Sequence, residues 1–404
     1  MDRESVYQEF GVPIVINAAG TKTRIGGSRI REEAVEAMGR AAEEFVRLSD
    51  LQARASERIA ELTGAEAGYV TSGAASALML GAAACIAGDD LGTMARLPHT
   101  DATPEIVMAR THRTEYDHAL RAAGATIVDV GTNDPHLGTG SRETEPWEIA
   151  DAITDDTVAL GYIAKSYSKP ALSTVTEIAH EHDVPVIVDA AAELPPVANF
   201  RRFTEAGADL VAFSGGKAIR GPQTTGILAG RRELVSSVAA QHLDVHAAEA
   251  VWEPPVDLLD VDRLGGVPRQ GIGRPMKVGK EELIGLLAAL DAFVEEDHDA
   301  RAVEWRERST RIAASLNSLS GVTTSIAAAE KVAVAPEVRV QVDADAAVSD
   351  AVGVVRDLRR EEPRVFVGAD SLPGAFTINP MCLDGEETDY VIERLRAHLG
   401  DEST

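Results

Sequence analysis

Apolar residues recur at helical spacing in some segments of the chain and form short continuous runs in others. Between residues 31 and 63 the apolar positions lie three and four apart, which predicts helices that end at Gly64. Short apolar runs typical of buried strands follow at residues 67–71, 105–109, 125–130, 157–164, 184–189, 210–213 and 225–230. Helical patterns separate most of these runs. One of these helices is expected to be capped by Ser173 and to extend through His182. This alternation predicts a mostly parallel sheet with helices on both faces.

Polar side chains follow several of the predicted strands at or just past the point where each strand ends. They are Ser72, His112, Ser166, Asp189 and Lys217. In open α/β sheets, ligands bind at the carboxyl ends of the strands. The sequence therefore predicts that these side chains gather at one ligand-binding edge of the sheet.

Lys217 stands at the most informative of these positions. The apolar run 210–213 stops at Ser214 and two glycines, and a loop closed by Gly221 and Pro222 follows the lysine. A tight turn of this kind allows a ligand to approach closely. A buried amine there would lose charge stabilisation and become nucleophilic, as a pyridoxal phosphate (PLP) Schiff base requires. The alternative is an ordinary lysine of a surface loop.

A second candidate ligand site lies between the strand 67–71 and a helix of small apolar residues. Residues 72–75, Ser-Gly-Ala-Ala, join the two. Backbone N–H groups at a helix N-terminus hold anions, and a serine hydroxyl adds a further hydrogen bond. Ser72 is alternatively the N-cap of the helix, which needs no ligand.

Two further strand-end residues fit a flat, nitrogen-containing cofactor. A carboxylate at the position of Asp189 either caps a turn or holds a pyridine nitrogen protonated, and Lys217 on a neighbouring strand favours the second interpretation. The imidazole of His112 either stacks on the cofactor ring or lies on the surface. The sequence leaves both alternatives open for His112.

The pattern changes near Arg301. A long helix to about Leu319 is followed by strand patterns at 323–326, 337–342, 364–368 and 375–379, with helical patterns at 346–359 and 386–399. This predicts a smaller α+β domain. We expect an N-terminal arm and helix over 1–45, a large PLP-binding domain over 46–265 and the small domain over 266–404.

Basic side chains are concentrated in two glycine-containing segments. The segment 17–28 contains Lys22 and Arg24, and the segment 271–280 contains Arg274 and Lys277. Each pair either binds an anionic substrate group or only balances charge in a solvated loop.

Composition narrows the class of protein. The 404 residues have a formal net charge of −26, spread over the whole chain, which opposes binding to nucleic-acid phosphates and suggests a salt-loving organism. The two cysteines, Cys85 and Cys382, form no disulfide framework and are expected to be buried thiols. Neither a signal peptide nor a membrane-length apolar stretch is visible, so we expect a cytoplasmic protein with no membrane partner. No metal site is expected.

With these motifs, the chain resembles fold-type-I PLP-dependent enzymes over nearly its full length. More narrowly, it is similar to the group that contains selenocysteine synthase (seryl-tRNA selenium transferase) and D-glucosaminate-6-phosphate ammonia-lyase. The residues that carry the resemblance are 16–21, 70–75, 188–196, 213–217 with 221–223, and 273–277. The resemblance implies a homodimer or an assembly of dimers.

The resemblance also implies roles for individual residues. Lys217 forms the Schiff base and acts as general base at Cα, and Asp189 pairs with the pyridine nitrogen. The cofactor phosphate is held by Ser72, Gly73, Ala74 and Ser214. His112 stacks on the ring, and Ser166 is a further cofactor contact.

The implied reaction is β-elimination from a small amino acid or a 2-amino-2-deoxy sugar acid, giving a 2-oxo acid and ammonia. Three alternatives remain: selenium transfer to tRNA-linked serine, transamination, and a non-catalytic binding protein of the same fold. The acidic charge and a chain that begins almost at the cofactor domain disfavour tRNA binding. The presence of both Lys217 and Asp189 disfavours the non-catalytic alternative.

Overall fold

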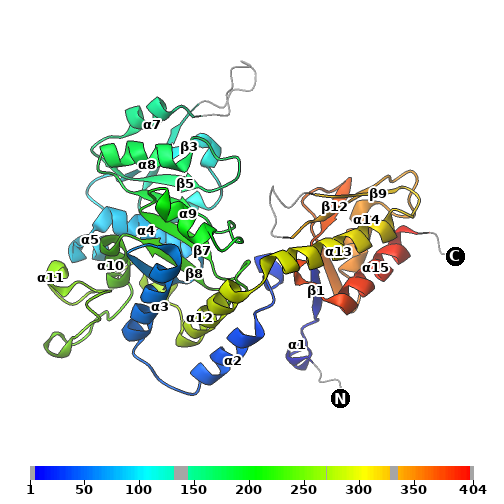
Figure 1. Ribbon diagram of the computed structural model, residues 1–404, viewed down its shortest axis with the longest axis horizontal. Helices are drawn as coiled ribbons and strands as arrows, with labels where there is room; N and C mark the ends of the chain where they lie inside the picture. Colours follow the sequence, from blue (N-terminus) through cyan, green and yellow to red (C-terminus); the bar gives the residue numbers. More distant parts are fainter. Residues whose placement is uncertain (1–4, 132–143, 270, 328–334, 401–404) are drawn as a thin grey trace. The chain divides into compact units, whose positions relative to one another are not determined.

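The computed structural model describes residues 5–131, 144–269, 271–327 and 335–400 (Figure 1). The chain divides into two compact units, one formed by residues 30–295 and the other by residues 1–29 together with 296–404. The domain boundaries predicted at 45/46 and 265/266 follow a different division and stay a prediction.

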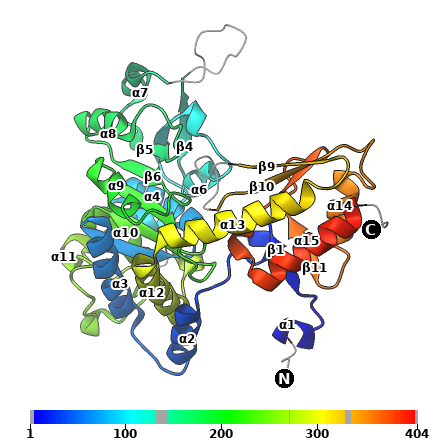
Figure 2. The same cartoon turned by 45° about the vertical axis from the view of Figure 1, so that its right-hand side comes forward.

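The unit of residues 30–295 is built on a seven-stranded sheet with the strand order β2-β8-β7-β6-β5-β3-β4. The five strands β3 to β7 run parallel to one another, whereas β8 pairs antiparallel with both β2 and β7. Figure 2 shows β4, β5 and β6 of this sheet from a second direction. The strands are β2 (Ala67–Thr71), β3 (Glu105–Ala109), β4 (Thr126–Val130), β5 (Thr157–Ile163), β6 (Val186–Asp189), β7 (Leu210–Ser214) and β8 (Gly226–Gly230). The predicted mostly parallel sheet is therefore confirmed.

Side chains alternate between the two faces of the sheet along each strand. Both faces carry apolar side chains, and helices cover both of them. On β7, Leu210 lies against Gly81 of α4, and Phe213 packs edge-to-face on Phe200 of α9 with ring centroids 5.3 Å apart. Figure 1 shows α8 and α9 in front of the sheet and α4 behind it. The helices of this unit are α2 (Glu32–Ala41), α3 (Leu48–Thr63), α4 (Ala74–Ala87), α5 (Leu91–Arg96), α6 (Asp117–Ala122), α7 (Pro146–Ala152), α8 (Leu172–Glu181), α9 (Asn199–Glu205), α10 (Arg232–Ala240), α11 (Val261–Leu264) and α12 (Lys280–Glu295).

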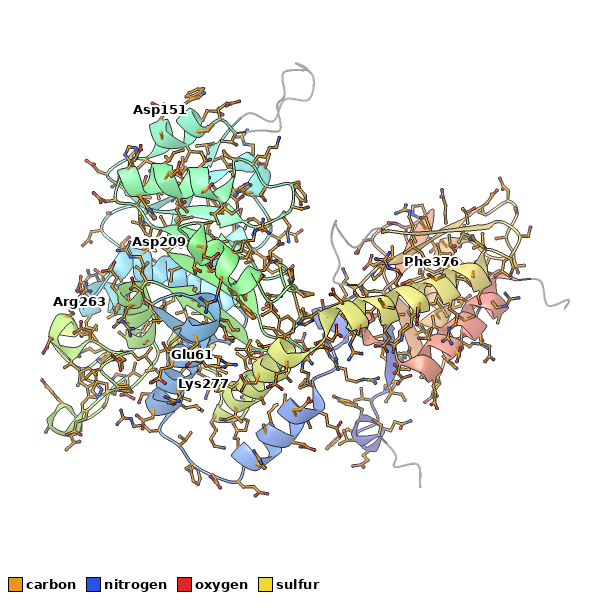
Figure 3. The ribbon with its side chains drawn as sticks, viewed as in Figure 1. Glu61, Asp151, Asp209, Arg263, Lys277 and Phe376 are labelled. Atoms are coloured by element: carbon orange, nitrogen blue, oxygen red, sulfur yellow. The ribbon has the colours of Figure 1, made fainter. Side chains whose placement is uncertain are left out.

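The other unit combines the N-terminal arm with the C-terminal part of the chain. A three-stranded antiparallel sheet has the order β12-β10-β9, and β1 pairs parallel with β11 in a second, two-stranded sheet. Its core includes the fully buried Phe376, labelled in Figure 3. The elements are α1 (Val6–Glu9), β1 (Val15–Ala18), α13 (His298–Leu316), β9 (Val322–Ile326), β10 (Val338–Val342), α14 (Ala351–Leu358), β11 (Arg364–Val367), β12 (Ala375–Ile378) and α15 (Gly385–Leu399). The predicted α+β character of the C-terminal region is thus observed.

Two local expectations were wrong. Ser173 does not cap α8, because the helix begins at Leu172 and its N-cap residue is Ala171, which makes no side-chain cap. The helix predicted from residue 346 begins at Ala351, where the Asp350 side chain accepts a hydrogen bond from the Gly353 N–H.

Cys85 and Cys382, which were expected to be buried thiols, are both only partly buried. No helix among the described residues is long and apolar enough to cross a membrane.

The packing of β7 against α9 yields a stability prediction. Phe213 is fully buried against Phe200 and Phe203. Phe213→Ala leaves a cavity that costs about 3–5 kcal/mol in the free energy of unfolding, measured by urea denaturation. The exposed Phe10 is the matched control, because Phe10→Ala removes no buried contact. Equal losses in the two variants would contradict this account of the core.

Candidate active site

A closed turn at the end of β7 presents Lys217. The N–H of Gly221 donates to the carbonyl of Gly215 (2.9 Å), and the N–H of Gly215 donates to the carbonyl of Thr225 (2.9 Å). A Cβ atom at Gly216 would lie 2.8 Å from the Cα of Gln223, and one at Gly215 would collide with the Thr225 hydroxyl. Only glycine therefore fits at either position, and the turn holds the lysine in one place.

The Lys217 amine is partly buried, and its surroundings favour the neutral form. Burial lowers its pKa from the ordinary lysine value, and the charge of Lys165 lowers it further. The carboxylates of Asp189 and Glu193 act in the opposite direction, and Asp189 has the larger effect of the two. An amine with a lowered pKa is a better nucleophile and base near neutral pH.

Asp189 is the last residue of β6, on the strand next to β7. In the sheet register it lies opposite Ala212, and its carbonyl accepts a hydrogen bond from the Ala164 N–H at the end of β5 (2.9 Å). Its Oδ1 accepts a hydrogen bond from the Ala191 N–H (3.0 Å). The carboxylate thus stabilises the turn and also acts on Lys217, while its pairing with a pyridine nitrogen stays a prediction.

The segment between β2 and α4 is open toward a ligand. The N-cap of α4 is Gly73, with φ +106° and no side-chain cap, so Ser72 is not the N-cap residue. The Ser72 hydroxyl instead lies 2.9 Å from the Ser76 hydroxyl. A Cβ atom at Gly73 would meet nothing within 4 Å. The backbone next to Gly73 is in contact with β8, because a Cβ atom at Gly226 would lie 2.6 Å from the Ala74 nitrogen. Free space in front of a 14-residue helix suits an anion.

His112 follows β3 in a short 3-10 helix (Arg110–His112) and is 3% exposed, so its interpretation as a surface residue is wrong. Its ring packs edge-to-face on Tyr162, with centroids 4.6 Å apart and planes at 86°. Burial lowers the pKa of His112 to about 4, although a hydrogen bond with the backbone of Lys169 opposes the shift. The imidazole is therefore neutral at pH 7.

A cavity of about 270 Å³ lies beyond the ends of β5 and β6. Ser166 is exposed and contributes to its lining, together with Lys165, Glu193 and Arg202. The nitrogen of Lys165 lies 3.7 Å from Oε1 of Glu193. Lys165 and Glu193 had no role in the sequence analysis, since nothing in their local sequence marks them as a pair.

The four predicted substrate-binding cations fall into two pairs, one in each compact unit. Lys22 pairs with Asp370 at 3.3 Å, and Arg24 is exposed, both in the unit that contains the chain termini. Arg274 and Lys277 are exposed in the unit of residues 30–295 (Figure 3 labels Lys277). The pKa of His242 is lowered to about 4, mainly by burial and to a smaller extent by the charges of Arg274 and Lys277. The structure thus places Arg274 and Lys277 near His242 rather than among the charges that act on Lys217.

Comparisons with known proteins agree with the motifs. The family model of L-seryl-tRNA selenium transferase matches residues 15–246. A 5'-C-glycyluridine monooxygenase-decarboxylase of Streptomyces sp is 33% identical, over 98% of this chain and 92% of the relative. The D-glucosaminate-6-phosphate ammonia lyase of Salmonella typhimurium is 30% identical, over 97% of each chain.

The solved structure of a D-glucosaminate-6-phosphate ammonia-lyase superposes with a TM-score of 0.79 at 28% identity and covers 98% of both chains. The L-seryl-tRNA(Sec) selenium transferase of Geobacter metallireducens matches over a shorter stretch. It is 28% identical over 46% of this chain and 39% of the relative. The similarity to the ammonia lyase is therefore the more extensive one.

The residues of the site fit pyridoxal phosphate. The fit rests on an amine with a lowered pKa, a carboxylate on the adjacent strand and free space for an anion at Gly73. Relatives of this kind are PLP-dependent, and this chain is a PLP-dependent enzyme of fold type I. With a family model that spans more than half of its length, the chain belongs to the L-seryl-tRNA selenium transferase family.

Proposed function

We propose that this enzyme is an ammonia-lyase that eliminates water from a 2-amino-3-hydroxy acid, after which uptake of one water releases ammonia and leaves a 2-oxo acid. The substrate class is a small amino acid or a 2-amino-2-deoxy sugar acid. The observation that carries the proposal is the Lys217 amine with a lowered pKa, beside Asp189, in a chain 30% identical to an ammonia lyase over 97% of its length.

The residues at the strand ends would hold the cofactor. Ser72, Gly73, Ala74 and Ser214 would bind its phosphate, Asp189 its ring nitrogen, His112 the face of its ring, and Ser166 its polar edge. The α4 N-terminus supports this assignment, since its dipole favours a negative charge. The buried imidazole of His112, neutral at pH 7, offers a flat ring that adds no positive charge to the site.

Bound PLP supplies an electron sink for negative charge at the substrate Cα. Lys217 then removes the Cα proton, because its lowered pKa leaves the amine neutral at a lower pH than that of a free lysine. The Asp189 carboxylate would keep the ring nitrogen protonated, and its charge acts on the Lys217 amine. Four basic side chains are proposed to attract the acid or phosphate group of the substrate to an otherwise acidic chain. They are Lys22, Arg24, Arg274 and Lys277.

A second candidate function is oxidative decarboxylation, which the 33% identity to the glycyluridine monooxygenase-decarboxylase favours. The two reactions differ in the bond broken at Cα, C–H or C–COO⁻. Oxygen uptake and CO₂ release with an amino acid substrate would identify decarboxylation, whereas ammonia and keto-acid release without oxygen uptake identifies the lyase. Selenium transfer is disfavoured by the net charge of −26, which opposes tRNA phosphates.

We further propose that the enzyme works in the cytoplasm at high salt as a homodimer or an assembly of dimers. The two free cysteines suit a reducing compartment, and the net charge suits high salt. Phe45 is 101% exposed, and Val35 and Val46 are also exposed on and after α2. Phe45 and Val46 line a hollow of about 540 Å³ together with the apolar Ala37, Ala41, Leu51 and Ile284 and the charged Arg40, Glu44 and Lys280. An apolar patch of this kind supports self-association.

Lys217→Ala should remove the visible absorption band that PLP gives when bound to the lysine, because no other amine is held at the end of β7. Purified protein with added PLP is scanned in high salt. Lys280→Arg is the control and should keep the band. A band of equal position and intensity in Lys217→Ala would contradict the assignment of the lysine.

Asp189→Asn should keep the band but reduce keto-acid and ammonia release by about 100-fold or more, because loss of one electrostatic contact to the developing charge costs that much. Release is assayed with 2-amino-2-deoxygluconate and its 6-phosphate. Wild-type rates in Asp189→Asn would show that the carboxylate only stabilises the turn after β6.

Phe45→Ser should lower the apparent mass of the enzyme from that of a dimer or larger assembly toward 42.8 kDa, measured by light scattering after size exclusion. The serine removes a large apolar side chain from the proposed contact. Phe10→Ser, at another exposed phenylalanine, is the control. An unchanged mass in Phe45→Ser would place the contact elsewhere.

A further inference from the structure

Glu193 lies in the turn that follows Asp189, within the segment 188–196 of the family resemblance, and the cofactor assignments above do not use it. Its backbone is fixed from both sides. Its N–H donates to the Ala190 carbonyl (3.1 Å), and its carbonyl accepts a hydrogen bond from the Asn199 side chain (2.5 Å). Its side chain is only 17% exposed. A glutamate with a fixed backbone and a mostly buried side chain differs from a solvated surface glutamate.

The carboxyl of Glu193 interacts electrostatically with the proposed base, Lys217. The Lys165 nitrogen lies 3.7 Å from it, and the charges of Lys165 and Glu193 both act on the Lys217 amine. Glu193, Lys165 and Arg202 also line the cavity of about 270 Å³ beyond β5 and β6. The carboxyl therefore lies beside Lys165, lines this cavity together with the exposed Ser166, and acts on the proposed base through its charge.

The surroundings of the Glu193 carboxyl keep it protonated up to a higher pH than is usual for a glutamate. Burial raises the pKa of Glu193, and Asp189 adds to the rise, while the cations Lys165 and Arg202 oppose it. A carboxylic acid with a raised pKa is suited to donate a proton near neutral pH.

The proposed elimination needs such a donor, and this inference rests on that proposed function. Hydroxide is a poor leaving group and departs readily only when its oxygen is protonated as the bond breaks. Lys217 takes up the Cα proton and Asp189 is engaged with the ring nitrogen. A separate acid is therefore required at the leaving oxygen.

We propose that Glu193 is the general acid that protonates the departing hydroxyl group, with Lys165 as its positioning residue. The Cα–H electron pair, left behind when Lys217 takes the proton, becomes the Cα–Cβ double bond. The Cβ–O bond breaks with its electrons on oxygen, which takes the Glu193 proton and leaves as water. Lys165 stabilises the resulting carboxylate, and the cavity returns a proton from solvent.

The test compares steps that need the acid with steps that do not. With 2-amino-2-deoxygluconate or D-serine, Glu193→Gln should reduce keto-acid release by about 100-fold or more, within the range that general acids contribute. Exchange of the Cα proton in D₂O, followed by NMR, should stay within a few-fold of wild type. 3-Chloro-D-alanine should restore keto-acid release, because chloride departs without a proton.

A spectroscopic readout is independent of turnover. The charged groups that act on Lys217 are Asp189, Lys165 and Glu193. At a pH above the pKa of Glu193 the carboxyl is ionised and its charge raises the pKa of Lys217, so in that range Glu193→Gln should lower the pH at which the visible band of the lysine-bound cofactor changes. Glu205→Gln, at an exposed position of α9, is the matched control and should leave this midpoint and all rates unchanged.

The outcomes separate the two proposals. A wild type that releases no keto acid from any hydroxy substrate overturns the ammonia-lyase proposal and the role of Glu193 with it. An active wild type whose Glu193→Gln variant equals it, or loses exchange and both eliminations equally, overturns only the role of Glu193. An unchanged pH midpoint in Glu193→Gln would show that the carboxylate does not act on Lys217.

Discussion

The site depends on one constraint, which is that a lysine amine is held partly out of water at the end of a core strand. β7 is buried on both faces from Leu210 to Phe213, and the turn after it is closed by backbone hydrogen bonds to the start of β8. The backbone therefore fixes where the amine lies before any ligand arrives. Removing water from a cation is costly, so the same constraint shifts the amine toward its reactive, neutral form.

The strand order brings the partners of this amine to it. β5, β6 and β7 are parallel neighbours, so their last residues meet at one edge of the sheet. Antiparallel β8 returns from the lysine loop and brings Gly226 against the backbone at Gly73 and Ala74, where α4 begins. The N-terminus of α4 and the lysine thus share one support. Small residues are required there because two backbones approach each other without room for a side chain.

Much of this arrangement could be predicted from the sequence, because it follows from local rules. Apolar runs predicted the strands, and among the polar residues that end them Asp189 is one of the charges that act on Lys217. The pairing of Lys165 with Glu193 could not be predicted, since it depends on how two irregular turns fold over the ends of β5 and β6. The N-cap at Gly73 was also missed, because serine is the commoner residue in that role. The burial of His112 against Tyr162 depends on a contact between β5 and the turn after β3, for which the sequence has no signal.

The pairing of β1 with β11 has a consequence for how the protein is made. Val15 lies opposite Arg364, so β1 finds its partner only after all the residues between them have been synthesised. The unit of residues 30–295 draws on one continuous stretch and is free to fold on the ribosome as it emerges. The first strand must meanwhile wait with unpaired backbone groups, exposed to wrong partners. Closing so long a loop makes this pairing a late step, and cofactor-site formation in residues 30–295 does not have to wait for it.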